Sequence, residues 1–209
     1  MRSIKNKTLR YLGIALIAIG IVIIAYPFYT NFVMKRREAD VMNSWENHIN
    51  LNTTTQSGIQ SQSSETTSGG QTAQSQQVIP GALFKITIPK INSSWVGYEG
   101  TNIPSLKRGP GHYIGTAMPG KLGTCIIAGH RTTYGAPFDR VDQLVNGDQI
   151  ILETTEGKQL IYLVTEKMEV LPNDLSALKQ TEYASLILTT STPKFYATRM
   201  LLVFAKLAE

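Results

Sequence analysis

The chain has 209 residues, 42% of them hydrophobic, so it is long enough for one domain with a buried core and only marginally for two. A single cysteine, Cys125, excludes an internal disulfide framework. Of the net charge of +5, most lies near the N-terminus: residues 1–33 hold four bases and no acid, whereas residues 80–209 hold thirteen bases and eleven acids. The C-terminal part is therefore nearly neutral, which argues against a nucleic-acid-binding protein.

The N-terminal region has the pattern of a membrane anchor. Residues 1–10 are basic, and residues 11–33 contain no charged side chain and end in an aromatic cluster suited to the lipid–water interface. Because about 20 apolar residues span the hydrocarbon core as a helix, we predict a transmembrane anchor at 11–33. Four bases before it and three directly after it favour a cytoplasmic N-terminus. A cleaved signal peptide is the alternative, but no small-residue cleavage site follows the apolar core.

Two further segments separate this anchor from the folded domain. Residues 34–50 are predicted to continue as a short polar juxtamembrane helix. Residues 51–79 are almost entirely Ser, Thr, Gln, Asn and Gly, which bury too little apolar surface to offset the entropy of ordering them. This composition predicts a flexible polar tether. We therefore place the folded domain at residues 80–209.

The folded domain is predicted to be mainly β. Short apolar or alternating runs bounded by turn residues indicate strands, and Glu156-Gly157 between two of them indicates a hairpin. One helical turn is expected within residues 101–108. Many short strands without a long amphipathic helix predict a compact barrel or sandwich. The predicted strands are residues 83–88, 95–98, 125–128, 150–154, 160–164, 166–171, 185–190 and 200–205.

Three polar residues near predicted strand ends could together carry acyl transfer. His130 follows an apolar strand, and an imidazole can transfer protons near neutral pH. Ser191 ends another strand just before Pro193, which cannot donate to a ladder. Arg199 cannot deprotonate, so it would hold a developing oxyanion rather than move protons. Taken singly, Ser191 and His130 are more often ordinary structural residues than catalytic ones.

The sequence predicts no metal and no cofactor. The three histidines, His48, His112 and His130, have no close ligand spacing with one another. Cys125 lies within an apolar strand, where a small buried thiol is the usual outcome. We therefore do not expect Cys125 to act as a nucleophile.

Three blocks, in order, resemble the sortase family: GPGHYIGT at 109–116, IAGHRTTYG at 127–135 and LTTSTPKF at 188–195, followed by Arg199. The first two blocks are most similar to class E, the housekeeping actinobacterial type. The resemblance implies a closed eight-stranded β-barrel with short helices, displayed on the outer face of a Gram-positive membrane. It also implies a transpeptidase that cleaves an LPxTG or LAxTG sorting signal and joins the new carboxyl end to a cell-wall amine, such as a peptidoglycan precursor.

The resemblance also implies roles for individual residues. His130 and Arg199 match the catalytic histidine and arginine of the family. Tyr113 matches a position implicated in signal recognition in class E members. Thr189 and Thr190 match the threonine-rich approach to the nucleophile.

Position 191 departs from the family, because the pattern has cysteine there and this chain has Ser191. A cysteine can be held as a thiolate beside an imidazolium, whereas a serine needs a general base positioned on its hydroxyl. We therefore expect transpeptidation to be greatly reduced or lost. Three explanations of Ser191 remain. It is an engineered exchange in a working enzyme, a natural loss that leaves a module binding sorting signals or wall precursors, or the nucleophile of a serine-using enzyme. An L,D-transpeptidase would need a Ser-x-Gly-Cys motif, which the sequence lacks.

Overall fold

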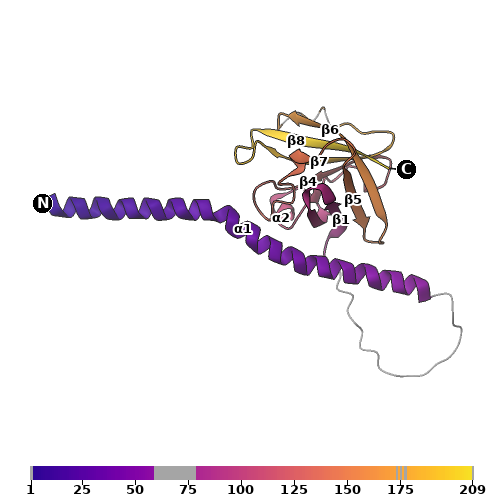
Figure 1. Cartoon of the computed structure of the whole chain (residues 1–209), viewed down its shortest axis with the longest axis horizontal. Coiled ribbons are helices and arrows are strands. Elements are labelled where there is room, and N and C mark those ends of the chain that lie inside the picture. The colour runs from indigo at the N-terminus through magenta and orange to yellow at the C-terminus, as the bar shows by residue number, and fades with distance from the viewer. Residues whose placement is uncertain (1, 59–78, 173, 175, 177, 209) are drawn as a thin grey trace, which may run out of the picture.

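In the part of the chain that the structure describes, eight strands close into a barrel and one long helix runs along it (Figure 1). The structure is a computed structural model that describes residues 2–58, 79–172, 174, 176 and 178–208. The helical elements are α1 (Arg2–Gly58), α2 (Ile103–Leu106) and the 3-10 turns η1 (Pro89–Ile91) and η2 (Val141–Gln143). The strands are β1 (Ala82–Ile88), β2 (Ser93–Glu99), β3 (Gly111–His112), β4 (Gly123–Ala128), β5 (Gln149–Thr154), β6 (Gln159–Val170), β7 (Ala184–Thr192) and β8 (Arg199–Leu207).

The strands follow the order β1-β2-β3-β4-β7-β8-β6-β5 around the barrel. The β2–β3 and β4–β7 pairs are parallel, and the other neighbours are antiparallel. The predicted eight-stranded barrel is confirmed, and α2 is the helical turn expected within residues 101–108. The parallel β4–β7 pair matters most for function, because it brings the ends of two distant segments to the same rim of the barrel.

Two details of the strand prediction are wrong. Residues 160–171 were expected to form two strands, but β6 is continuous, and its pairing with β8 shifts register between Val164 and Glu166. The apparent break in the pattern is therefore a bulge, which inserts an unpaired residue without ending a strand. β3 was not predicted, because its two residues are too few to show alternation.

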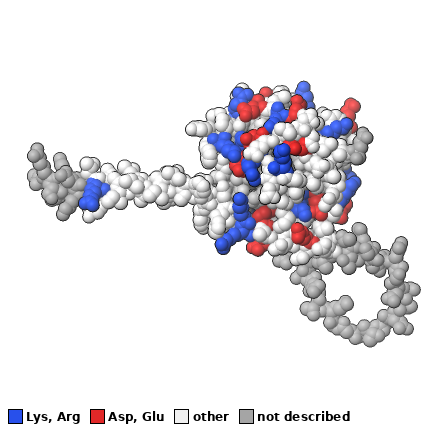
Figure 2. All heavy atoms as spheres, in the orientation of Figure 1, with Lys and Arg blue, Asp and Glu red and all other residues white. Residues whose placement is uncertain are grey.

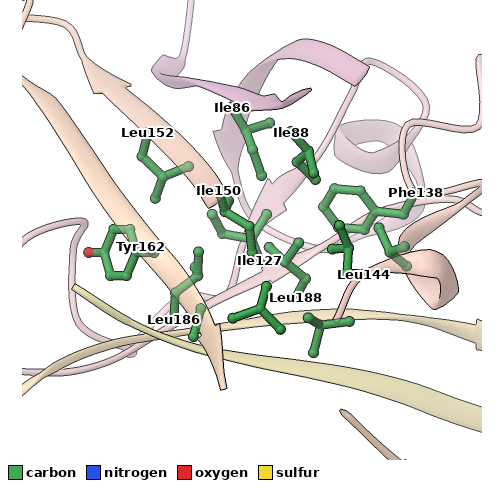
Figure 3. Close-up of a cluster of buried hydrophobic side chains, with 14 of the residues drawn as sticks. Ile86, Ile88, Ile127, Phe138, Leu144, Ile150, Leu152, Tyr162, Leu186 and Leu188 are labelled. Carbon is green, nitrogen blue, oxygen red and sulfur yellow. The ribbon is translucent and has the colours of Figure 1, made fainter. Parts of the chain in front are cut away.

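The barrel interior is a continuous apolar core (Figure 3). Side chains alternate along a strand, so Leu186 and Leu188 of β7 point inward, where they lie near Ile127 of β4. Ile187, between them, belongs to a second cluster on the outer face. Since β7 is buried on both faces over most of its length, its end is held rigidly in place. That end carries position 191.

Helix α1 bends as it reaches the barrel (Figure 1). Pro27 lies inside the helix, and a proline there removes a backbone N–H and kinks the chain. The projecting part is uncharged over most of its length (Figure 2), and α1 is long and apolar enough to cross a membrane. The predicted helix at 34–50 is confirmed. Residues 51–58, expected to begin the tether, are helical instead, because adding residues to an existing helix avoids the free-energy cost of nucleating a new one. The rest of the predicted tether, at 59–78, lies outside the described residues.

The second half of α1 packs on the edge of β2. β2 pairs with β3 only at its last two residues, and the N–H of Val96 donates instead to Glu38 Oε1 at 2.7 Å. Trp45 is 1% exposed, packs against Val96 and Tyr98, and donates its indole N–H to Glu153 Oε2 at 3.2 Å. Burial raises the pKa of Glu38 to about 7. The helix thus covers a sheet edge that would otherwise be open.

Candidate active site

The candidate site lies at the ends of the parallel strands β4 and β7. The register pairs Ala128 with Thr189, and the ladder continues as the Gly129 N–H donates to Thr189 O at 3.1 Å. Continuing this register by two residues puts His130 beside Ser191. Ser191 is exposed and, by alternation, lies on the outer face of the barrel with Thr189. The β4–β7 register therefore directs two of the predicted catalytic residues toward the same rim of the barrel.

His130 is partly buried against the loop that follows it. Its ring centroid lies 5.0 Å from that of Tyr134, with the rings tilted by 49°. Burial and the nearby cation of Lys107 lower the pKa of His130, which favours the neutral imidazole. Within the described residues, its buried Nε2 has no hydrogen-bond partner. A neutral ring with an unpartnered nitrogen is able to accept a proton from, or bind, a group that enters the site.

Arg199 lies at the same end of the barrel but is held away from Ser191. Ser191 pairs with Met200, whereas Arg199 pairs with Thr192, so alternation puts the arginine on the other face of the strand pair. Its Nη2 donates to Glu169 O at 3.1 Å, and its Nε lies 3.6 Å from Glu169 Oε2. Glu169 Oε1 also accepts from Thr192 Oγ1 at 3.2 Å. A catalytic role for Arg199 therefore requires its half-exposed side chain to turn toward position 191.

The two threonines before Ser191 differ in what they contact. Thr190 is buried, and its hydroxyl donates to Gly129 O at 2.8 Å, so it fixes β7 to the backbone just before His130. Thr189 is also buried, but its Oγ1 has no hydrogen-bond partner among the described residues. It shares this property with His130 Nε2. Buried polar groups are normally paired, so two unpartnered polar atoms on these neighbouring strand ends mark an unusual feature of this part of the fold.

Tyr113 directly follows β3, which runs antiparallel to β4. Its backbone N–H donates to Ile126 O at 2.8 Å, and the residue is 42% exposed. Gly111 pairs with Ala128 at the end of β4, so Tyr113 lies further from His130 than Gly111 does along that strand. His112, just before it, is buried, and its ring nitrogens contact Glu99, Ala117 and Thr116. The two histidines thus differ in their hydrogen bonding: the ring nitrogens of His112 have partners within the fold, whereas His130 Nε2 has none among the described residues.

Arg131 is a site residue that sequence reasoning missed. It is buried, and its Nη1 donates to Ser191 O at 3.2 Å while its Nη2 pairs with Asp142 Oδ1 at 2.9 Å. Its Nε donates to Asp139 O at 3.5 Å. The guanidinium therefore joins the loop after β4 to the end of β7. The only signal in the sequence was its position next to His130.

Other parts of the barrel offer no substitute chemistry. Cys125 is buried inside the barrel, and burial raises the pKa of its thiol to about 12, so it stays protonated and inert as predicted. No group of three or more metal-ligating side chains occurs in the described ranges. A cavity of about 250 Å³ opens between α1 and the loop after β4. It is lined by Asn31, Lys35, Trp95, Thr132, Arg140 and Phe195, among others.

The closed eight-stranded barrel and its parallel β4–β7 pair have the form expected of a sortase, with serine at the strand end where the family pattern has cysteine. The sortase domain matches residues 86–208, and the chain belongs to the sortase family.

Relatives from two sortase classes match it. Sortase SrtE1 of Streptomyces coelicolor is 35% identical over 147 residues, which cover 62% of this chain and 42% of SrtE1. Sortase D of Bacillus subtilis is 37% identical over 112 residues, which cover 53% of this chain and 54% of sortase D. The chain thus spans about half the length of the curated relatives it matches.

A solved structure of a class E member also matches. Sortase E1 of Streptomyces coelicolor, with a tripeptide in its active site, aligns with a TM-score of 0.57 and 29% identity over 62% of this chain and 89% of that chain. The predicted similarity to class E is confirmed, and the similarity extends to class D.

Proposed function

We propose that the chain is a sortase-type transpeptidase that cleaves an LPxTG-like or LAxTG-like sorting signal and joins the new carboxyl end to a cell-wall amine. The observation that carries this proposal is the parallel pairing of β4 and β7 up to Ala128 and Thr189, which supports a site in which His130 lies beside position 191. The tripeptide in the active site of sortase E1 supports a peptide substrate. A peptidoglycan precursor is the proposed source of the amine.

The reaction would proceed in two acyl transfers. His130 takes the proton of the side chain at position 191 as that side chain attacks the scissile carbonyl carbon, and it delivers this proton to the leaving amine as the C–N bond breaks. The acceptor amine then attacks the acyl-enzyme and loses a proton to His130, which returns it to the side chain at position 191 as the acyl bond breaks. Arg199, once turned away from Glu169, would stabilise the oxyanion. Tyr113, which is exposed, and Thr189 would contact the bound signal, with Thr190 fixing the strand beneath it. Because Thr189 Oγ1 is buried, its contact would require neighbouring groups to move aside.

Ser191 would slow both transfers. A serine hydroxyl is not ionised at neutral pH, so His130 would have to remove its proton as a general base. The lowered pKa of His130 favours the neutral ring, which is the form able to accept the serine proton. The obstacle is weak activation, because no side chain among the described residues orients the ring as the third member of a triad does. We infer greatly reduced or absent turnover for the serine form.

The proposed setting is the outer face of a Gram-positive cell membrane. α1 would cross the bilayer once, with the N-terminus in the cytoplasm and the barrel outside. This arrangement puts the barrel on the side where exported proteins and cell-wall amines meet. The domain layout proposed for the chain is an anchor at 11–33, a juxtamembrane helix, a linker and the sortase domain.

The serine at position 191 favours a second candidate function. A pseudoenzyme with the same strand-end site would capture sorting signals or wall precursors without turning them over. It would retain the two orphan polar atoms of the site and lose only the chemistry.

One experiment separates the two functions. The full chain in detergent micelles, as Ser191 and as Ser191→Cys, is incubated with an LPxTG or LAxTG peptide and triglycine, and the products are followed by mass spectrometry. We expect transpeptidation only by the cysteine form, and its loss when His130→Ala is added. Turnover by the serine form at a comparable rate would refute the proposed inactivity. Binding of the peptide by both forms, without reaction in either, would establish the binding module.

A further inference from the structure

The loop that follows His130 is bound by one side chain of α1. Asn31 Nδ2 donates to Thr132 O at 3.0 Å, and Asn31 Oδ1 accepts from the Gly135 N–H at 2.9 Å. A side-chain amide carries both a donor and an acceptor, so one asparagine can hold both ends of a short turn. These two bonds join residues more than 100 positions apart in the sequence.

The loop has a backbone conformation that needs such support. Tyr134, Gly135 and Ala136 have φ angles of 51°, 82° and 50°. Residues with a Cβ rarely adopt this left-handed region, and such a conformation persists only where the surroundings fix it. Gly135 also lies against the ring of Trp95, where a Cβ would come within 2.1 Å of the ring. The loop is therefore confined between β2 on one side and α1 on the other.

Tyr134 contacts both α1 and His130, and so links the confined loop to the candidate site. Its hydroxyl lies 3.1 Å from the Tyr26 hydroxyl of α1, and its ring packs on His130. Lys107 Nζ lies 5.3 Å from the centroid of the Tyr134 ring. Tyr134 thus stands between the anchor helix and the histidine. A displacement of the helix at this point would move the group that packs on the imidazole.

The contacts come from the end of the predicted anchor. Tyr26 and Asn31 both lie within residues 11–33, next to the aromatic cluster expected at the lipid–water interface. A helix inserted in a bilayer is fixed in depth and direction by such interfacial side chains. The His130 loop therefore rests on a part of the chain whose place the membrane sets.

We propose that the Tyr26–Asn31 segment of α1 is a built-in positioning element for the active site, and that Asn31 and Tyr26 are positioning residues for His130. Neither residue needs to touch substrate; both act through the 132–135 loop. The catalytic consequence rests on the proposed transpeptidase function. The structural consequence, an altered environment of the imidazole, does not.

The test uses the full chain in micelles and two pairs of matched variants. Asn31→Ala removes both loop bonds, and its control is Asn43→Ala, the same exchange at an exposed position of the same helix. Tyr26→Phe removes only a hydroxyl, and its control is Tyr29→Phe, whose ring is 68% exposed. The imidazole signal of His130, assigned by comparison with His130→Ala, is titrated by NMR in each. Turnover is measured in the Ser191→Cys background.

We expect Asn31→Ala to raise the pKa of His130 toward its ordinary value of about 6.5, because the loop no longer buries the ring. We expect kcat to fall about 10- to 100-fold with little change in KM, since a misplaced proton carrier slows the chemical step rather than binding. Tyr26→Phe should shift the titration in the same direction by less. If both variants titrate and turn over like their controls, the positioning role is wrong. If the Ser191→Cys parent itself is inactive, the proposed function fails, and the titrations still decide the positioning role.

Discussion

Replacing Glu38 by glutamine should remove a pH-dependent weakness in the contact between α1 and the barrel. Glu38 is 8% exposed, and burial raises the pKa of its carboxyl from 4.5 to about 7, partly opposed by the hydrogen bond from Val96. A carboxyl whose pKa is higher in the folded protein favours folding when it is protonated. Its contribution is therefore complete below about pH 4.5 and is lost as the pH rises through about 7.

The size of the effect follows from the two pKa values. A difference of about 2.5 in pKa corresponds to about 3 kcal/mol, or roughly a 300-fold change in the equilibrium between docked and undocked helix. Glu38→Gln keeps an oxygen that can accept from the Val96 N–H at the observed 2.7 Å but cannot ionise. At pH 8 the variant should therefore hold the helix more tightly, by up to about 3 kcal/mol.

Hydrogen exchange at the Val96 amide reports this contact directly. In the full chain in micelles, the protection factor of Val96, corrected for the intrinsic pH dependence of exchange, should fall between pH 5 and 8. In Glu38→Gln it should stay level. Glu46→Gln, at an exposed position of the same helix, is the control and should behave like the parent. Constant protection in the parent, or an equal fall in the Glu38→Gln variant, would refute the reasoning.

Two substitutions near the site should destabilise the barrel by different routes. Arg131→Met removes a buried guanidinium and its ion pair with the half-exposed Asp142. We expect the free energy of unfolding, measured by denaturant titration, to fall by about 2 kcal/mol. Hydrogen bonds to charged groups contribute about 1.5–3 kcal/mol each, and water can solvate the carboxylate that is left without its partner. Gly135→Ala adds a Cβ that meets the Trp95 ring at 2.1 Å. We expect backbone strain and overpacking together to lower the free energy of unfolding by about 2–4 kcal/mol. The tryptophan fluorescence should shift as well.

Each of these changes has a control. Gly147→Ala places an alanine at nearly the same positive φ, +88°, with nothing within 4 Å of the new Cβ, so it should show the strain without the clash. Equal losses in the two alanine variants would mean that Trp95 does not confine the loop. For Arg131, the control is Lys121→Met at an exposed position. If Arg131→Met unfolds at the same denaturant concentration as that control, the guanidinium does not join the two strand ends.

The barrel could be predicted because its signals are local. Apolar alternation in runs of four to eight residues indicated each of the longer strands, and the order of three sequence blocks indicated the closed topology through family resemblance. The errors in the strand prediction also have local causes. β3 is too short to show a period, and the bulge at residue 165 of β6 interrupts the pattern without ending the strand. The helix also runs to Gly58, beyond the composition change that marked the tether.

The site could be predicted only as a set of residue types at strand ends. His130 and position 191 were found because they lie in recognisable motifs, and their adjacency follows from the parallel β4–β7 register. Arg199 was named for the same reason, but its pairing opposite Thr192 and its contacts with Glu169 could not be read from the motif. Which face a strand-end side chain takes depends on the exact register, and a shift of one residue reverses it.

The amino-acid sequence was sufficient to establish an N-terminal segment apolar enough to span a membrane, a mainly β domain, and a histidine and a nucleophile-type position in sortase order, because periodicity and motifs are properties of neighbouring residues. Only the tertiary structure could show that Asn31 holds the His130 loop, that Glu38 occupies an open strand edge, and that Arg131 is buried against position 191. These contacts join residues 58 to 104 positions apart. Burial of a charge and pairing of a backbone edge depend on what lies nearby in space, which separation along the chain does not reveal.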